Sequence, residues 1–155
     1  MKKERKEMEG CDVFYFSVGN EGAGEFGQEL EMSLREASGA SSEITLGMEN
    51  ASFARALHGS ENELTGIARC AEVMIDTART CSGSRNIDIE ITISITGEKI
   101  VLSVMDNGSD YGSSLKKNES CPGQRCTGEI LWSIADDIKY QNILGMNYTI
   151  IEVSA

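Results

Sequence analysis

The sequence predicts an α+β fold: a two-layer sandwich with helices packed on one face of a mostly antiparallel sheet. Two patterns carry this prediction. Isoleucines alternate strictly with polar residues from Ile87 to Thr96, which is typical of a strand with one buried and one solvated face. Before them, residues 60–81 place apolar side chains at helical spacing, and Ser60 and Glu63 fit a capping box at the start of this helix.

The first 40 residues are interpreted as an N-terminal extension, residues 1–40, that precedes the main domain at residues 41–155. Residues 1–10 are a charge run, which we expect to be a frayed or solvated N-terminus. Asp12–Val18 is aromatic and β-branched, as strands are. Glu25–Ala37 repeats apolar residues four positions apart, as amphipathic helices do. The glycines between these two elements match neither of the two common phosphate-loop spacings, GxGxxG and GxxxxGK(S/T). We therefore interpret them as a turn.

The middle of the chain is predicted to contain a β-hairpin. A short strand at residues 43–48 and a short helix at 51–57 are expected before the long helix. After the isoleucine strand, a Gly-Glu-Lys turn leads into Ile100–Met105, a strand predicted to be buried on both faces, and the two strands pair antiparallel. Residues 106–125 then form a long polar loop, and a loop of this length in a compact domain is usually functional or mobile.

The C-terminal part is predicted to add one helix and a second hairpin. Thr127 caps a helix that runs to about Asp137. Lys139–Leu144 and Tyr148–Val153 are the expected strands of a closing hairpin around Gly145. The order of helices and strands therefore fits one sheet with helices on one side.

The net charge of −11 excludes several classes of partner. Nucleic acids and anionic membranes attract Lys and Arg, so we expect neither as a ligand. No apolar run is long enough for a transmembrane helix, and none follows the basic start as a secretion signal requires, so a cytoplasmic protein is predicted. The five cysteines follow no disulfide pattern and are expected to be free thiols.

Two acids on the long helix are candidate catalytic and metal-binding residues. Glu72 and Asp76 lie four positions apart and therefore share one helix face. Such a pair can supply a general base and a ligand for Mg²⁺, which takes one or two protein carboxylates together with waters and substrate phosphates. Taken alone, a pair like this is more often two solvated acids on an exposed edge.

A second group of candidates follows the hairpin. Asp106 directly follows a predicted strand and can accept a hydrogen bond from a heteroaromatic amine, while Gly108 lets a ring approach the backbone. By itself, Asn-Gly is first of all a turn signal. Thr127 and Gly128 begin the next predicted helix, and the free N–H groups of a helix start suit a phosphate, although almost every helix has such a start.

In order and spacing, these residues resemble the GHKL-type, histidine-kinase-like ATPase domain in its anti-sigma-factor serine-kinase branch. Residues 72–76 (Glu-Val-Met-Ile-Asp) resemble the Glu-x-x-x-Asn motif of a family helix. Residues 106–108 (Asp-Asn-Gly) resemble its strand-ending Asp-x-Gly, with Tyr111 in the place of the aromatic that follows. Residues 134–140 and 145–149 resemble its C-terminal segments.

The resemblance covers roughly residues 43–155 and implies ATP and Mg²⁺ as cofactors. It implies that Glu72 is the catalytic base and that Asp76 holds Mg²⁺. It also implies that Asp106 binds the adenine amine, with Thr149 in support.

The resemblance also implies that Gly108 lets the adenine ring approach the backbone. At the phosphate end, it implies contacts at Thr127 and Gly128. Two departures affect this end. Asp76 stands where the family has Asn and adds negative charge near the phosphates. The lid at residues 123–128 has glycines only at its two ends, so fewer flexible amides reach the phosphates.

Two functions are therefore expected. The first is an ATP-dependent serine kinase that phosphorylates or sequesters a small regulatory protein. The alternative is a non-catalytic binding module that kept the fold, lost ATP turnover and uses its sheet or helices to hold a partner. A homodimer is compatible with both, and titration with ATP and Mg²⁺ distinguishes them.

Overall fold

The computed structural model describes residues 2–8, 11–43, 61–83, 86–96, 99–116 and 127–154. In chain order, its elements are β1 (Lys2–Met8), β2 (Cys11–Val18), α1 (Ala23–Glu43), α3 (Glu61–Ser82), β3 (Ile89–Thr96), β4 (Lys99–Asp106), the 3-10 helix η1 (Gly112–Leu115), α4 (Thr127–Ile134), β5 (Asp137–Ile143) and β6 (Met146–Ser154). The six strands form one antiparallel sheet in the order β1-β2-β3-β4-β6-β5. The predicted α+β class is confirmed.

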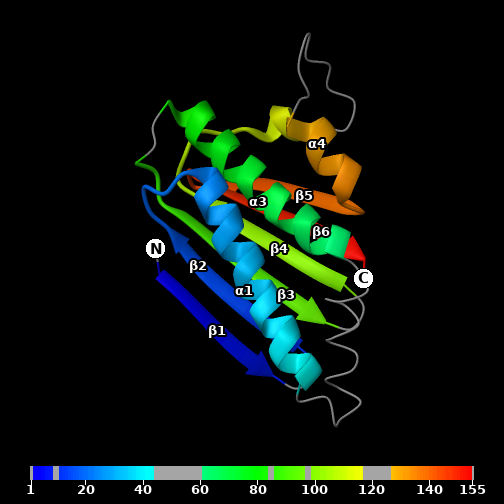
Figure 1. The fold of residues 1–155 in the computed structure, drawn as a ribbon. Coiled ribbons are helices and arrows are strands. Elements are labelled where there is room, and N and C mark those ends of the chain that lie inside the picture. Colours follow the sequence, from blue (N-terminus) through cyan, green and yellow to red (C-terminus); the bar gives the residue numbers. More distant parts are fainter. Residues whose placement is uncertain are drawn as a thin grey trace.

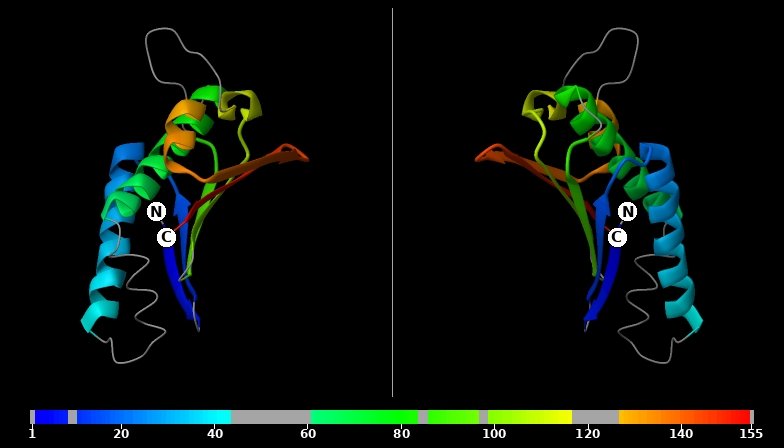
Figure 2. Two further views of the ribbon diagram at one scale, coloured as in Figure 1. Left: turned by 90° about the vertical axis from the view of Figure 1, so that its right-hand side faces the viewer. Right: turned by 90° about the vertical axis from the view of Figure 1, so that its left-hand side faces the viewer.

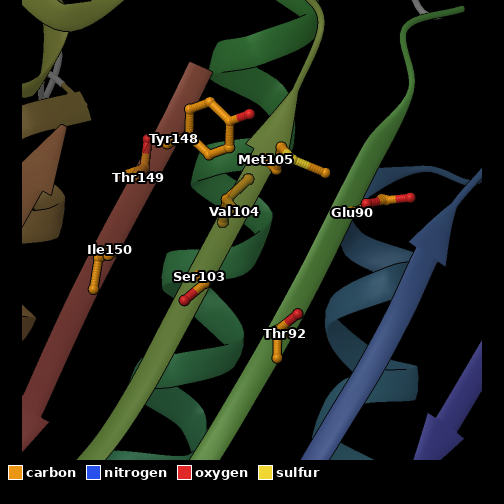
Figure 3. Close-up of a pocket in the computed structure, with 8 residues that line it drawn as sticks. All are labelled: Glu90, Thr92, Ser103, Val104, Met105, Tyr148, Thr149 and Ile150. Atoms are coloured by element: carbon orange, nitrogen blue, oxygen red, sulfur yellow. The ribbon is translucent and has the colours of Figure 1, made fainter. Parts of the chain in front are cut away.

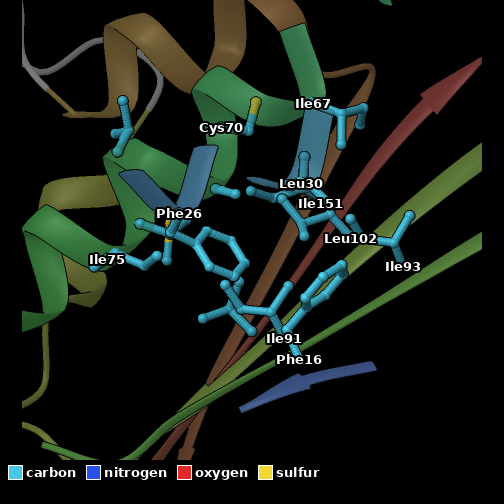
Figure 4. Close-up of a cluster of buried hydrophobic side chains, with 14 of the residues drawn as sticks. Phe16, Phe26, Leu30, Ile67, Cys70, Ile75, Ile91, Ile93, Leu102 and Ile151 are labelled. Atoms are coloured by element: carbon cyan, nitrogen blue, oxygen red, sulfur yellow. The ribbon is translucent and has the colours of Figure 1, made fainter. Parts of the chain in front are cut away.

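The described helices all lie on one face of the sheet, and no described element packs on the other, which we call the uncovered face. Figure 1 shows α1 and α3 side by side across the sheet with α4 beside α3, and Figure 2 shows all three on the same side of it. Figure 4 shows the core between the two layers, where strand side chains such as Ile91 meet Phe26 and Leu30 of α1 and Ile75 of α3. The rings of Phe16 and Phe26 pack edge to face with their centroids 5.4 Å apart, which is a preferred geometry for an aromatic pair.

The alternation predicted for the isoleucine strand is confirmed, because β3 buries every second residue. β4, predicted to be buried on both faces, buries only one. Val101, Ser103 and Met105 lie half-buried on its other face, because no described helix covers that side of the sheet. The apolar composition of β4 therefore gave a wrong prediction for its outer face.

The charge run at the N-terminus, predicted to be frayed, forms the edge strand β1 instead. Two of its cations, Lys3 and Arg5, have partners on the helix-covered side. The Arg5 guanidinium donates to both carboxylate oxygens of Asp12 and lies 5.3 Å from the centre of the Phe14 ring. The ammonium of Lys3 donates to the Ser33 hydroxyl of α1 at 2.8 Å. A charged strand is well suited to a sheet edge, because its charges discourage pairing with another chain.

Residues of the predicted N-terminal extension contribute to the same sheet as the rest of the chain. β2 pairs with β3 along its whole length, and α1 packs on α3. The buried guanidinium of Arg79 in α3 also holds the glycine-rich turn, since it donates to the carbonyl oxygens of Glu21 at 2.6 Å and Gly19 at 2.8 Å.

Several predicted boundaries differ from the observed ones. α1 continues past the predicted end at Ala37, because Ser and Gly cost a helix only about 0.5–1 kcal/mol each. α4 ends at Ile134, where the backbone N–H of Asp136 donates to the Glu152 carbonyl and draws the chain into the sheet. Apart from Glu43, the short strand and helix expected at residues 43–57 lie outside the described residues. Among the described helices, none is long and apolar enough to cross a membrane.

Candidate functional site

Five polar side chains gather where β4, β5 and β6 meet the segment after β4. Strand register places Asp106 opposite Asn147 and Tyr140 opposite Thr149, all on the helix-covered face of the sheet. Tyr111, from the segment between β4 and η1, completes the group and is almost fully buried. We call Asp106, Tyr111, Tyr140, Asn147 and Thr149 the polar cluster.

The Asp106 carboxylate is 0% exposed and is hydrogen-bonded entirely within the chain. Its Oδ1 accepts from the Asn147 side-chain amide at 2.8 Å and from the Gly108 backbone N–H at 2.9 Å. Its Oδ2 accepts from the Tyr111 hydroxyl at 2.7 Å. A buried carboxylate is tolerated when hydrogen bonds compensate its lost hydration, and here three donors do so.

Asn147 connects the cluster to the backbone after β4. Its Nδ2 donates to Asp106 and also lies within hydrogen-bonding distance of the carbonyl oxygens of Ser109, at 2.9 Å, and Gly108, at 3.2 Å. All three of these groups are acceptors, so the amide nitrogen, and not its oxygen, must face them. The Oδ1 of Asn147 accepts from the Asn142 amide at 2.9 Å.

The two tyrosines of the cluster remain protonated donors at neutral pH. Burial raises the pKa of Tyr111, and raises that of Tyr140 to about 12. Since the Tyr111 proton is donated to Asp106, its oxygen is free to accept from the Thr149 hydroxyl at 3.2 Å. The Tyr140 hydroxyl lies 2.8 Å from Oδ1 of Asp110, and the two rings lie 5.3 Å apart.

Gly108 is close to protein atoms and not to an open space. A Cβ atom at this position would lie 2.2 Å from the Ser82 hydroxyl of α3. That hydroxyl donates to the Ala78 carbonyl at 2.7 Å and accepts from the Ser109 backbone N–H at 3.2 Å. The glycine therefore allows the segment after β4 to pack against the end of α3.

The start of α4 is also packed by the chain itself. The Thr127 hydroxyl lies 3.0 Å from the Thr77 hydroxyl of α3, within hydrogen-bonding distance. Gly128 is buried, and a Cβ atom there would lie 2.2 Å from the Lys116 carbonyl oxygen. The Trp132 indole N–H donates to the Leu115 carbonyl at 3.0 Å. Backbone that follows η1 therefore packs closely against the first turn of α4, the helix start predicted to receive a phosphate.

The predicted base and metal ligand lie outside the polar cluster. The Glu72 side chain packs against α1, because a Cβ atom added at Gly27 would lie 2.0 Å from Oε1 of Glu72. The Glu72 carboxylate also forms an ion pair with the Arg69 guanidinium at 3.4 Å. Asp76 is exposed on α3. Within the described parts of the chain, no group of three His, Cys, Asp or Glu side chains could hold a metal ion.

Of the predicted site residues, the structure brings together Asp106, Gly108 and Thr149. The sequence also placed Tyr111 in this motif, but as a replacement for an aromatic ring and not as a hydrogen-bond donor. Asn147 and Tyr140 were missed as site residues. A signal for Asn147 exists in the sequence, because Asn147, Thr149 and Ile151 share the strand face that packs on the core.

The chain encloses the carboxylate of Asp106, the residue to which the resemblance gives adenine binding. This carboxylate has no exposed surface, and the Tyr111 hydroxyl donates to its Oδ2. For Mg²⁺, Asp76 supplies a single exposed carboxylate, and Glu72 is turned toward α1.

A scan against protein-family models matches no family, and a search of the curated proteins finds no significant match.

Proposed function

We propose that this chain is a protein-binding module that resembles a histidine-kinase-like ATPase in fold and does not turn over ATP. The observation that carries the proposal is the closed hydrogen-bonding of Asp106 by Tyr111, Asn147 and the Gly108 backbone. In this proposal, Asp106 is a structural residue that fixes the segment after β4.

Binding of adenine at Asp106 would require the chain around its fully buried carboxylate to move. If Tyr111 left the carboxylate, its own buried hydroxyl would lose both Asp106 and Thr149 as partners. A buried polar group without a partner costs about 1–3 kcal/mol, so the closed arrangement opposes nucleotide binding. The start of α4 also packs closely against the chain, since a Cβ atom at Gly128 would lie 2.2 Å from the Lys116 carbonyl oxygen.

Protein binding is supported by the uncovered face of the sheet. Tyr148 and Ile150 on β6 are each 38% exposed there, and Leu144 at the end of the β5–β6 hairpin is 98% exposed. Exposed apolar side chains that lie together on a soluble protein commonly mark a contact surface.

Isothermal titration with ATP and Mg²⁺ tests the proposal, with thermal unfolding as a second readout. We expect neither heat of binding nor a rise in melting temperature at millimolar ATP, since a ligand that binds only the folded state must raise it. Tyr111→Phe removes the donor to Oδ2 of Asp106 and should lower stability without creating ATP binding. Tyr148→Phe on the opposite face of the sheet is the matched control, and should change neither the stability of the chain nor its response to ATP.

The competing function, an ATP-dependent serine kinase, is favoured by the proximity of Asp106, Gly108 and Thr149, as the resemblance implies. It predicts micromolar, Mg²⁺-dependent ATP binding that is lost in Asp106→Asn. That result would overturn the proposed loss of nucleotide function. Phosphoryl transfer that is abolished in Glu72→Ala with ATP affinity retained would then identify Glu72 as the base.

A further inference from the structure

The uncovered sheet face is electrically neutral although the chain carries a net charge of −11. Its described strand residues include equal numbers of lysines and acids, namely Lys2, Lys6, Lys99, Lys139, Glu4, Glu90, Asp137 and Glu152. Several of them pair on the face itself, as Lys99 does with Glu152 at 3.5 Å and Lys2 with Glu4 at 3.3 Å. The acidic excess therefore lies elsewhere on the molecule, and this face can approach another acidic protein without strong repulsion.

The β5–β6 hairpin projects from the sheet on the uncovered side, away from the helices (Figure 2). Residues 140–151 contain no charged residue, in a chain in which 25% of residues are charged. The turn places Leu144 at φ 52° and Gly145 at φ 79°. Asn or Gly is the usual residue at the position that Leu144 occupies, because a leucine is strained at positive φ. Leu144 is unfavourable for a second reason, since its apolar side chain is exposed to water.

A hollow of about 280 Å³ lies on the same face, beside the base of this hairpin. Figure 3 shows the side chains that line it, among them Glu90 and Thr92 of β3, Ser103 and Met105 of β4, and Tyr148 and Ile150 of β6. Met105, Tyr148 and Ile150 give it apolar walls, and Glu90 is the one charged residue of its lining. The molecule therefore carries an apolar projection and an apolar hollow on one face.

We infer that the partner of this face is a second copy of the chain. In the resulting two-fold dimer, Leu144 of each copy enters the hollow of the other. A projection and a hollow on the same surface allow that surface to contact a second copy of itself, as a closed two-fold contact requires. The neutrality of the face allows two chains of like net charge to meet there. The inference rests on the proposed use of this face for protein binding and is independent of whether ATP binds.

Sedimentation or light scattering of the full chain without nucleotide tests the dimer, from about 1 µM to about 300 µM, the range in which modest interfaces dissociate. We expect a concentration-dependent dimer. Leu144→Asn removes the apolar side chain and suits the backbone better, so the variant should fold and dimerise at least tenfold more weakly. Ile150→Glu in the hollow should do the same. Met32→Glu is the matched control, because Met32 is 57% exposed on α1, on the opposite side of the molecule.

A mixing experiment distinguishes the reciprocal contact from other uses of the same face. Leu144→Asn retains an intact hollow, and Ile150→Glu retains an intact projection. Together they can form a heterodimer with one of the two contacts intact, whereas each variant alone loses both. We therefore expect the mixture to dimerise more strongly than either variant.

A wild-type chain that stays monomeric at the highest concentration would overturn the inference and leave the face to a different protein. A dimer unaffected by both variants, a mixture no stronger than its components, or growth into open polymers would also overturn it. ATP titration is measured separately, so failure of the dimer and failure of the proposed loss of nucleotide function can be told apart.

Discussion

The side-chain amide of Asn147 donates to the buried carboxylate of Asp106 at 2.8 Å and thereby joins β6 to the end of β4. The same nitrogen lies close to two backbone carbonyls of the segment after β4. One side chain therefore holds together a strand end, its neighbouring strand and the segment that leads to Tyr111.

Asn147→Ala should lower the free energy of unfolding by about 3 kcal/mol, because it removes one of three donors to a buried carboxylate and the amide hydrogens nearest to two backbone carbonyls. Urea unfolding measures the loss. Asn142→Ala is the matched control, since Asn142 is exposed and donates to Asn147 from outside. It should cost less than about 1 kcal/mol. Equal losses in the two variants would contradict the central position of Asn147.

Gly27→Ala should destabilise the chain although alanine is the better helix former. The new methyl group would lie 2.0 Å from Oε1 of Glu72, so this side chain would have to leave its place against α1. In a Glu72→Ala background the obstacle is absent, and Gly27→Ala should then stabilise the chain by about 0.5–1 kcal/mol through helix propensity. A double-mutant cycle of unfolding free energies measures this change of sign. The same sign in both backgrounds would mean that Glu72 does not pack on Gly27.

Leu144→Gly should stabilise the folded monomer by about 0.5–1 kcal/mol, because glycine adopts positive φ without steric cost. Chemical unfolding at concentrations too low for self-association measures the gain. Leu144→Ala removes the exposed side chain and keeps the backbone strain, so it should give no comparable gain. A stable alanine variant would show that exposure, and not backbone conformation, makes Leu144 unfavourable.

Stability should fall as the pH rises above about 10, the ordinary pKa of tyrosine. Burial raises the pKa of Tyr111 in the folded state, so the unfolded chain releases this proton first. The stabilisation is complete below the unfolded pKa. It is then lost at about 1.4 kcal/mol per pH unit for this group until the folded pKa is reached. Urea unfolding from about pH 9 to about pH 11 measures the slope. Tyr111→Phe should give a shallower slope, and an unchanged slope would contradict the buried, protonated state of Tyr111.

The fold class could be predicted from the sequence because the isoleucine strand and the long helix have clear and different periods. Burial of β3 follows that period residue by residue. The edge strand β1 could not be predicted in this way. Its stability depends on pairing with β2 and on partners such as Asp12 and Ser33, which the local charge run does not reveal.

The candidate site could be predicted in part. Asp106 and Thr149 were identified from motifs, and the structure places both in the polar cluster. The closure of Asp106 by Asn147 and Tyr111 could not be foreseen, because it depends on the register between β4 and β6 and on the path of the segment after β4. A one-residue shift in that register would turn Asn147 to the opposite face.

The pairing of β2 with β3 has a consequence for the order of folding. Phe14 lies opposite Ile93, so this contact joins positions 79 residues apart, the difference between 93 and 14. The β3–β4 and β5–β6 hairpins instead join near neighbours in the chain. Closing a long loop costs more chain entropy than forming a hairpin, and contacts between distant positions slow folding. We therefore expect the two hairpins to form early and the docking of β2 on β3 to limit the folding rate.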